Sequence, residues 1–147
     1  MKKLRNILSE IFNSHYPYTK RDDEFGSTGT FKTEGGDYTI NINHSIYGNN
    51  AGLSFKDKNN HYDVYGITGK ENFSSHKIIG TVKHFAHTHL KANPHIENIM
   101  FSSDEKEPTR TKLYHTLAQS IDKNYKSWHK PKFGTRFTLK NPYHTSE

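Results

Sequence analysis

The sequence predicts a single α+β domain with a mixed sheet: an N-terminal helix, an antiparallel β-meander, and then a helix, a strand and a second helix. Three observations predict it. Apolar residues recur at helical spacing near the N-terminus, alternate with polar residues in the middle, and return to helical spacing after residue 74. The 147 residues suit one domain, 1–147. We expect the N-terminal helix at 2–14, the meander at 28–68, the helix–strand–helix at 74–125 and a basic aromatic tail at 126–147.

The N-terminal helix is predicted from apolar residues at intervals of three and four, namely Leu4, Ile7, Leu8, Ile11 and Phe12. The two lysines at its start are typical of a signal peptide, but polar residues interrupt the apolar stretch, so we do not expect export by that route. No segment has the roughly 18 consecutive apolar residues of a membrane-spanning helix, so no membrane partner is expected. The stretch 15–29 is interpreted as a polar connection, broken by Pro17 and Gly26.

The meander is predicted from strands on either side of Gly35-Gly36, a strong hairpin signal. In the second strand Tyr38, Ile40 and Ile42 alternate with polar residues, which indicates one buried face. The stretches "AGLSF" and "HYDVYGI" follow as further strands, joined by the polar "KDKNN" turn.

The second helix is predicted from the stripe Ile78, Val82, Phe85 and His89, with Ser74 or Ser75 as its N-cap. The apolar "IENIMF" then forms a strand, and the order strand–helix–strand indicates a crossover with parallel pairing. The last helix opens with Pro108 in its first turn, and its core stripe is Leu113, Leu117 and Ile121.

Composition limits the chemistry. The chain has no cysteine, which excludes disulfides, cysteine-ligated zinc and a cysteine nucleophile. Its net charge of +6 favours acidic partners such as nucleic acid or phosphate-bearing cofactors, although solubility explains this charge equally well. Five histidines are candidate metal ligands: His76, His84, His87, His89 and His95. They match no metal-ligand spacing, and we expect His89 to be a hydrogen-bonded core residue and no metal to bind.

Two further stretches carry candidate binding residues. The loop before the second helix could hold a pyrophosphate on backbone N–H groups. Its candidate residues are Gly69, Lys70, Ser74, Ser75 and Lys77. An ordinary capped helix start is the simpler interpretation of this loop. The C-terminal segment interleaves cations with rings, and its candidates for contact with nucleic acid are Lys126, Trp128, Lys130, Lys132 and Arg136. The alternative for this segment is a solvated tail whose rings pack on the core.

Arg110 and Tyr114 lie one helical turn apart, just after a strand end. A tyrosine in this place can act as a general acid, but more often it packs its ring and exposes its hydroxyl. From Tyr62 to Tyr125 the sequence resembles a group of largely uncharacterised bacteriophage proteins, which share an apolar strand ending in Phe-Ser and a "PSR-x-KLY" motif, here "PTRTKLY". The order of elements also resembles the later half of the GNAT N-acetyltransferase superfamily. That resemblance implies acyl-CoA pyrophosphate at residues 69–78 and Tyr114 as general acid toward the CoA thiolate, although the superfamily's pyrophosphate signature is absent.

Two functions follow as expectations. The first is a phage-encoded, GNAT-like accessory protein that works in the host cell cytoplasm and binds acetyl-CoA as an N-acetyltransferase. Tyr114 and Arg110 would be its catalytic residues, and its acceptor would be a protein or a small molecule. The second is a non-enzymatic phage protein that binds nucleic acid, or a host or virion protein, through its basic aromatic C-terminal segment.

Overall fold

A computed structural model of the chain describes residues 14–33, 36–44, 49–57, 73–103, 108–132 and 134–145. Within these ranges seven strands and two helices follow one another along the chain. The strands are β1 (Tyr18–Asp23), β2 (Gly26–Thr33), β3 (Gly36–His44), β4 (Asn50–Asp57), β5 (Asn98–Ser103), β6 (Lys126–Lys130) and β7 (Gly134–Lys140). The helices are α2 (Phe73–Ala92) and α3 (Pro108–Ile121).

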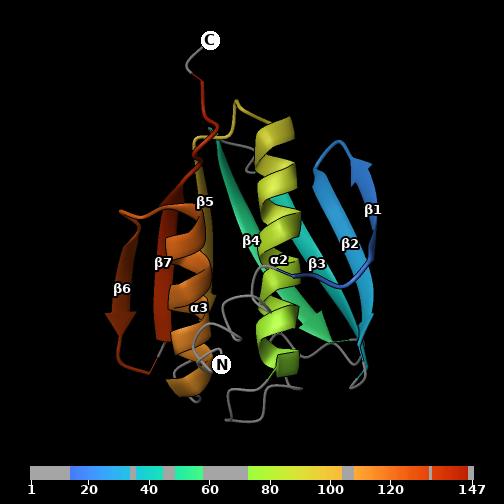
Figure 1. Ribbon diagram of the computed structural model, residues 1–147. Helices are drawn as coiled ribbons and strands as arrows, with labels where there is room; N and C mark the ends of the chain where they lie inside the picture. The colour runs from blue at the N-terminus through green and yellow to red at the C-terminus, as the bar shows by residue number, and fades with distance from the viewer. Residues whose placement is uncertain are drawn as a thin grey trace, which may run out of the picture.

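All seven strands belong to one mixed sheet with the order β1-β2-β3-β4-β5-β7-β6 (Figure 1). The first four strands pair antiparallel in sequence order. β5 then pairs parallel with β4, and β7 lies between β5 and β6 and is antiparallel to both. The parallel pair is connected through α2, because parallel neighbours need a crossover that returns the chain to the same end of the sheet.

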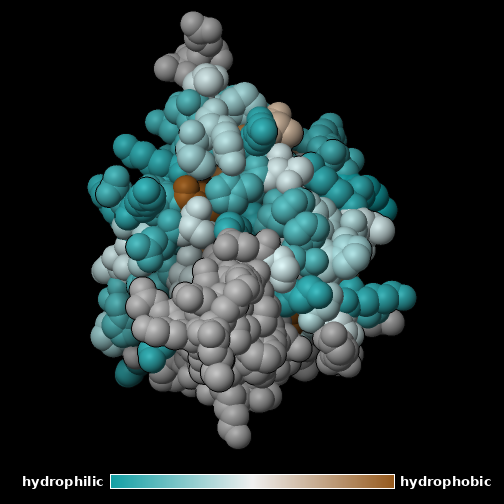
Figure 2. Space-filling model, in the orientation of Figure 1, coloured by the Kyte–Doolittle hydropathy of each residue, from teal (hydrophilic) through white to brown (hydrophobic). Residues whose placement is uncertain are grey.

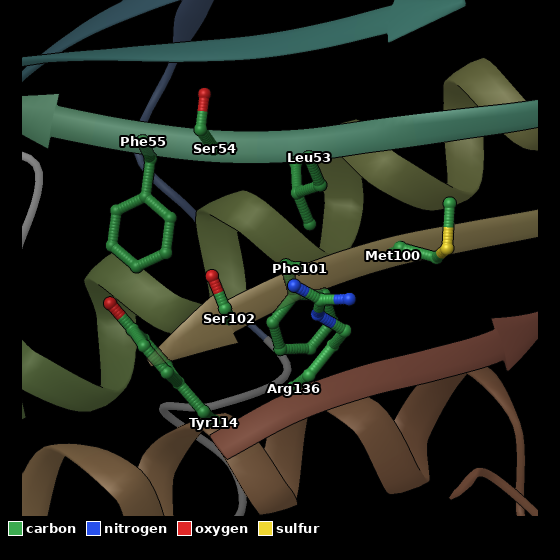
Figure 3. Close-up of a pocket in the computed structure, with 8 residues that line it drawn as sticks. All are labelled: Leu53, Ser54, Phe55, Met100, Phe101, Ser102, Tyr114 and Arg136. Atoms are coloured by element: carbon green, nitrogen blue, oxygen red, sulfur yellow. The ribbon is translucent and has the colours of Figure 1, made fainter. Parts of the chain in front are cut away.

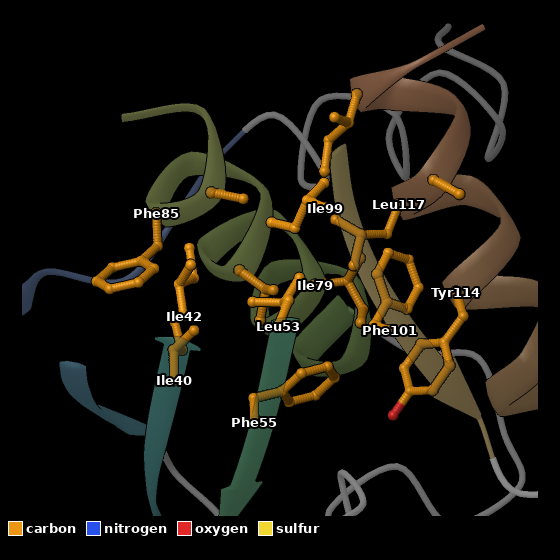
Figure 4. Packing of buried hydrophobic residues seen from close by; sticks show 14 of the residues in the cluster. Ile40, Ile42, Leu53, Phe55, Ile79, Phe85, Ile99, Phe101, Tyr114 and Leu117 are labelled. Atoms are coloured by element: carbon orange, nitrogen blue, oxygen red, sulfur yellow. The ribbon is translucent and has the colours of Figure 1, made fainter. Parts of the chain in front are cut away.

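Both helices pack on one face of the sheet, α2 over β2 and β3, and α3 over β5 and β7 (Figure 1). Every second residue of the central strands points into this layer, for example Ile40 and Ile42 on β3 and Phe137 and Leu139 on β7. These side chains meet the apolar stripes of the helices in one continuous core (Figure 4). The other face of the sheet carries mainly polar side chains, and neither helix covers it.

The predicted fold class is wrong. The described chain is strand-rich, with a seven-stranded sheet and two helices, rather than an α+β arrangement that begins with a helix and a short meander. The predicted polar connection at 15–29 contains β1 and the start of β2. In the predicted tail at 126–147 a strand was expected near "TRFTLK", where β7 lies, and β6 pairs with it as a hairpin that was not expected. The strands β1 and β6 form the two edges of the sheet and are almost fully exposed, so they lack the alternation that marks a half-buried strand.

Several local predictions are confirmed. Strands β2 and β3 form the hairpin expected around Gly35-Gly36, with Thr33 opposite Gly36. The helix at 74–91, the strand "IENIMF" and the helix from Pro108 are present within two residues of their expected bounds, and β4 and β5 pair in parallel as expected. The N-terminal helix at 2–14 and the strand "HYDVYGI" lie outside the described residues.

The helix side of the molecule is mainly hydrophilic in the space-filling view (Figure 2). Exposed positions of α2 and α3 supply this surface, as expected for amphipathic helices whose apolar stripes face a sheet. In the described ranges neither helix is long and apolar enough to cross a membrane.

Candidate functional site

The sheet opens between β4 and β5. Their parallel pairing covers only three positions and ends with Gly52 opposite Met100. β4 continues to Asp57 against β3, and β5 continues to Ser103 against β7, so the two halves of the sheet diverge beyond Gly52 (Figure 1). We call the space between the diverging strands the β4–β5 gap.

Backbone groups of both strands face the β4–β5 gap. The carbonyl oxygen of Asn49 accepts a hydrogen bond from the N–H of Glu97, which shows that Asn49 directs its carbonyl toward β5. Backbone groups on a strand change sides at every residue, so Leu53 and Phe55 direct their N–H and C=O groups into the gap. In the described part of the chain no strand pairs with them on that side.

A cavity of about 550 Å³ occupies the β4–β5 gap (Figure 3). Its size is within the range of about 300–1,000 Å³ that is typical of small-molecule sites. Its walls come from β4, β5, β7 and α3, and its lining residues are Leu53, Ser54, Phe55, Met100, Phe101, Ser102, Tyr114 and Arg136. Leu53, Phe55, Phe101 and Tyr114 lie toward the helix layer, whereas Ser54, Met100, Ser102 and Arg136 lie on the polar face of the sheet, so the cavity connects the two.

Tyr114 lines this cavity on the side of the helix layer. α3 presents it on the face that packs on the sheet, and its side chain is only 3% exposed. Its ring meets Phe55 and Phe101 edge-on, with centroid separations of 5.6 and 6.0 Å. This packing directs the hydroxyl toward the gap, beside the Phe55 ring (Figure 3). The predicted catalytic candidate therefore lines the cavity where the sheet opens between β4 and β5.

Arg110 is the third residue of α3, one turn before Tyr114. Its backbone lies in the first helical turn, near the end of β5, but its side chain lies outside the described residues. The structure therefore places the predicted pair on one helix.

Arg136 joins the cavity to the outer edge of the sheet. It lies opposite Ser102 on β5 and opposite Trp128 on β6. Directly opposed residues share a face of the sheet, so Ser102, Arg136 and Trp128 form a row across three strands on the polar face. The sequence assigned Arg136 and Trp128 to a basic tail, and the structure shows that they belong to a hairpin that reaches the cavity.

The predicted phosphate-binding loop is only partly described. Gly69 and Lys70 lie outside the described residues, as do the side chains of Ser74 and Ser75. α2 begins at Phe73, so both serines fall inside its first turn instead of capping it. The Nζ atom of Lys77 lies 4.5 Å from the centre of the Tyr16 ring. A phosphate contact by Lys77 would require this cation–π contact to rearrange.

A second polar cluster lies where β1, β2, β3 and α2 meet. As predicted, His89 is a buried, hydrogen-bonded residue: its Nδ1 lies 2.9 Å from the Ser27 hydroxyl and its Nε2 lies 2.8 Å from Nε2 of His44. The Ser27 hydroxyl in turn donates a hydrogen bond to the carboxylate of Asp22. Burial, together with the neighbouring His44, lowers the pKa of His89 to about 4.

Other histidines also lie close to one another: the His95 ring is 5.9 Å from that of His44, and the His84 ring stacks on that of His15 at 3.8 Å. His87 is half-buried, with ring nitrogens 3.0 Å from the Tyr143 hydroxyl and 3.2 Å from the Ser120 carbonyl oxygen. His84 contacts the Tyr18 hydroxyl at 2.8 Å. Within the described ranges, no three histidine or carboxylate side chains come together as a metal site.

Sequence reasoning missed most of the cavity lining. Leu53 and Phe55 were read only as strand residues, and Met100 and Ser102 only as the end of a strand. The available signal was the crossover between "AGLSF" and "IENIMFSS", because ligands of open sheets bind beyond the carboxyl ends of parallel strands. Searches with the chain matched no family model, no curated protein and no solved structure.

Proposed function

We propose that the protein binds acyl-CoA in the β4–β5 gap and transfers the acyl group to an amine. The observation that carries the proposal is the cavity that interrupts the sheet with Tyr114 in its wall. The pantetheine arm of CoA is a narrow, extended chain with two amides. Such a chain can pair with the backbone groups of Leu53 and Phe55 much as an added strand would.

The surroundings of the gap suit the rest of the cofactor. β4 and β5 both end at the edge of the sheet where α2 and α3 begin (Figure 1). The N–H groups and dipoles of helix N-termini favour an anion, so the pyrophosphate of CoA would lie at this edge. The order of elements, which resembles the later half of the GNAT N-acetyltransferase superfamily, implies the same placement. CoA thioesters are intracellular metabolites, which agrees with action in the cytoplasm of a phage-infected host.

Tyr114 would act as the general acid. When an amine displaces the thioester sulfur, the departing thiolate gains a full negative charge that a nearby proton donor stabilises. The Tyr114 hydroxyl points into the gap from a ring held on both sides by Phe55 and Phe101, so it is positioned before the substrate arrives. A phenol O–H can donate its proton to a departing thiolate, so a tyrosine is a suitable general acid.

Isothermal titration calorimetry with acetyl-CoA and with CoA tests the proposal. We expect micromolar binding of acetyl-CoA, and weaker binding of pantetheine alone because it lacks the pyrophosphate. A bulky substitution at Ser54 in the cavity wall should reduce the affinity. Absence of heat at millimolar acetyl-CoA would refute the proposed function.

A second candidate function is binding of nucleic acid without catalysis. The observation that favours it is the indole of Trp128, 61% exposed on the β6–β7 hairpin beside Arg136. An exposed tryptophan next to cations is an arrangement that stacks unpaired bases and holds phosphates. Binding of single strands by a protein that does not bind acetyl-CoA would select this function.

A further inference from the structure

The polar face of β5, β7 and β6 forms a basic surface that begins at the β4–β5 gap. Ser102 on β5, Arg136 on β7 and Trp128 on β6 lie side by side in one row across the strands. In the next rows Lys126 on β6 lies beside Thr138 on β7, and Lys140 on β7 lies beside Asn98 on β5. We call this surface the Trp128 platform; it also includes Lys130, whose Nζ lies 6.0 Å from the Trp128 ring. Among its described residues the platform carries four cations and no carboxylate.

The platform is open to a large partner. Trp128 is 61% exposed, and Lys126, Lys130, Arg136 and Lys140 are exposed as well. Both helices lie on the opposite face of the sheet, so they do not compete for this surface. The ring of Trp128 and the surrounding cations match the two components of a single-stranded nucleic acid, its unpaired bases and its phosphates.

We propose that the acyl acceptor is an amine carried by single-stranded nucleic acid bound on the Trp128 platform. This inference rests on the proposed acyl-CoA function. Arg136 connects the two sites, because it lines the cavity and also lies directly opposite Trp128. Strands β5 and β6 are two strand spacings apart, about 10 Å. A base stacked on Trp128 would therefore leave the amine of the neighbouring nucleotide at the mouth of the cavity.

The acyl transfer needs no reactant besides acetyl-CoA, the amine and water. The amine nitrogen bonds to the thioester carbonyl carbon, and the carbon–sulfur bond breaks with its electron pair on sulfur. The thiolate takes the proton of the Tyr114 hydroxyl, the amine releases one proton to water, and Tyr114 regains its proton from solvent. The products are an amide on the strand and free CoA.

Trp128 is the single tryptophan of the chain, so the fluorescence of the intact protein reports directly on stacking. We expect single-stranded DNA or RNA oligonucleotides to quench this fluorescence, and the comparison of the two shows which sugar is preferred. A duplex of the same length should quench less, because its bases are already paired. Affinity should fall with salt with a logarithmic slope of roughly −2 to −3 for three or four phosphate contacts.

Substitutions separate the contribution of base stacking to strand binding from the contribution of the positive charges. Trp128→Leu should weaken binding of a dye-labelled strand about 5- to 150-fold, whereas Trp128→Phe, which keeps an aromatic face, should lose less. Phe25 is a matched control, since it is also 61% exposed but lies in the β1–β2 turn, so Phe25→Leu should have no effect. Lys126→Gln should weaken binding and reduce the salt slope, whereas Lys91→Gln on the exposed side of α2 should not.

Transfer of carbon-14 from labelled acetyl-CoA to the oligonucleotide decides whether the bound strand is the acceptor. Label on the strand that is lost in Trp128→Leu supports the proposal. If acetyl-CoA binds by calorimetry but strands do not bind, or bind without gaining label, the nucleic-acid acceptor is refuted and the acyl-CoA function stands. If acetyl-CoA itself does not bind, both proposals fail, and strand binding alone then indicates the non-enzymatic function.

Discussion

The Nε2 atoms of His44 and His89 lie 2.8 Å apart, although 45 positions separate the two residues in the chain. The Ser27 hydroxyl donates its only proton to Asp22, so it must accept the Nδ1–H of His89. Because its pKa is lowered to about 4, His89 is neutral near pH 7, so its Nε2 carries a lone pair and accepts a hydrogen from His44 Nε2. This chain of hydrogen bonds links β1, β2, β3 and α2, and it requires His89 to be neutral.

The first prediction concerns acid stability. Folding lowers the pKa of His89 from 6.5 to about 4, so between these values the unfolded chain binds more protons than the folded one. The stability that depends on neutral His89 is therefore fully present above pH 6.5. As the pH drops toward 4 the free energy of unfolding falls, by about 3 kcal/mol if His89 alone titrates. Lowered pKa values at His44, His84 and His87, each mainly from burial, act in the same direction.

Urea unfolding at a series of pH values between 4 and 7 measures this loss. His89→Gln keeps hydrogen-bonding atoms but removes the titrating group, so its stability should change less over the same range. An equally steep pH dependence in His89→Gln would show that other groups cause it.

The second prediction concerns Tyr114. Tyr114→Phe keeps the ring that packs on Phe55 and Phe101 and removes only the hydroxyl. The release of CoA thiol from acetyl-CoA, with an added amine as acceptor, should slow about 100-fold or more, while the affinity for acetyl-CoA by calorimetry changes little. Tyr143→Phe is the matched control, because that hydroxyl contacts His87 away from the gap. An unchanged rate in Tyr114→Phe would exclude the general-acid role.

The third prediction tests whether the β4–β5 gap holds the ligand. Ser54 lines the cavity from the exposed face of β4, so Ser54→Leu should fill part of the space and weaken acetyl-CoA binding at least 10-fold. Asn43→Leu introduces the same side chain at an exposed position of β3 that does not line the cavity, and it should leave the affinity unchanged. Equal effects of the two variants, measured by calorimetry, would argue against binding in the gap.

The fourth prediction concerns the contact between β2 and α2. A Cβ atom added at Gly29 would lie 2.5 Å from Cε2 of Phe85, closer than real side-chain contacts. Gly29→Ala should therefore destabilise the fold by about 1–3 kcal/mol through overpacking. At Gly52 an added Cβ meets no atom within 4 Å, so Gly52→Ala should be neutral or slightly stabilising.

Thermal unfolding compares these variants. A smaller side chain at position 85 should partly relieve the clash, so the double variant Gly29→Ala with Phe85→Leu should be more stable than additivity of the two single changes predicts. Strictly additive effects would show that Phe85 does not limit the size of residue 29.

The sequence by itself determined the elements whose pattern is set by burial. Helix α2 and helix α3 each keep an apolar stripe at helical spacing, and β3 alternates between core and polar residues, because each of these elements has one face on the core. The same stripe identified His89 as a buried residue, and the strand–helix–strand order predicted the parallel pairing of β4 and β5. Tyr114 was selected by its position after a strand and by resemblance.

Only the tertiary structure decided where strands end their pairing and which residues then meet. The edge strands β1 and β6 are solvated on both faces, so burial imposes no period on them, and the predicted fold class failed there. The cavity arises because β4 and β5 separate after Gly52, an arrangement that no single residue marks in the sequence. The strand register also places Arg136 between the cavity and Trp128. Arg136 and Trp128 are eight positions apart in the chain, and the sequence does not show that they lie side by side.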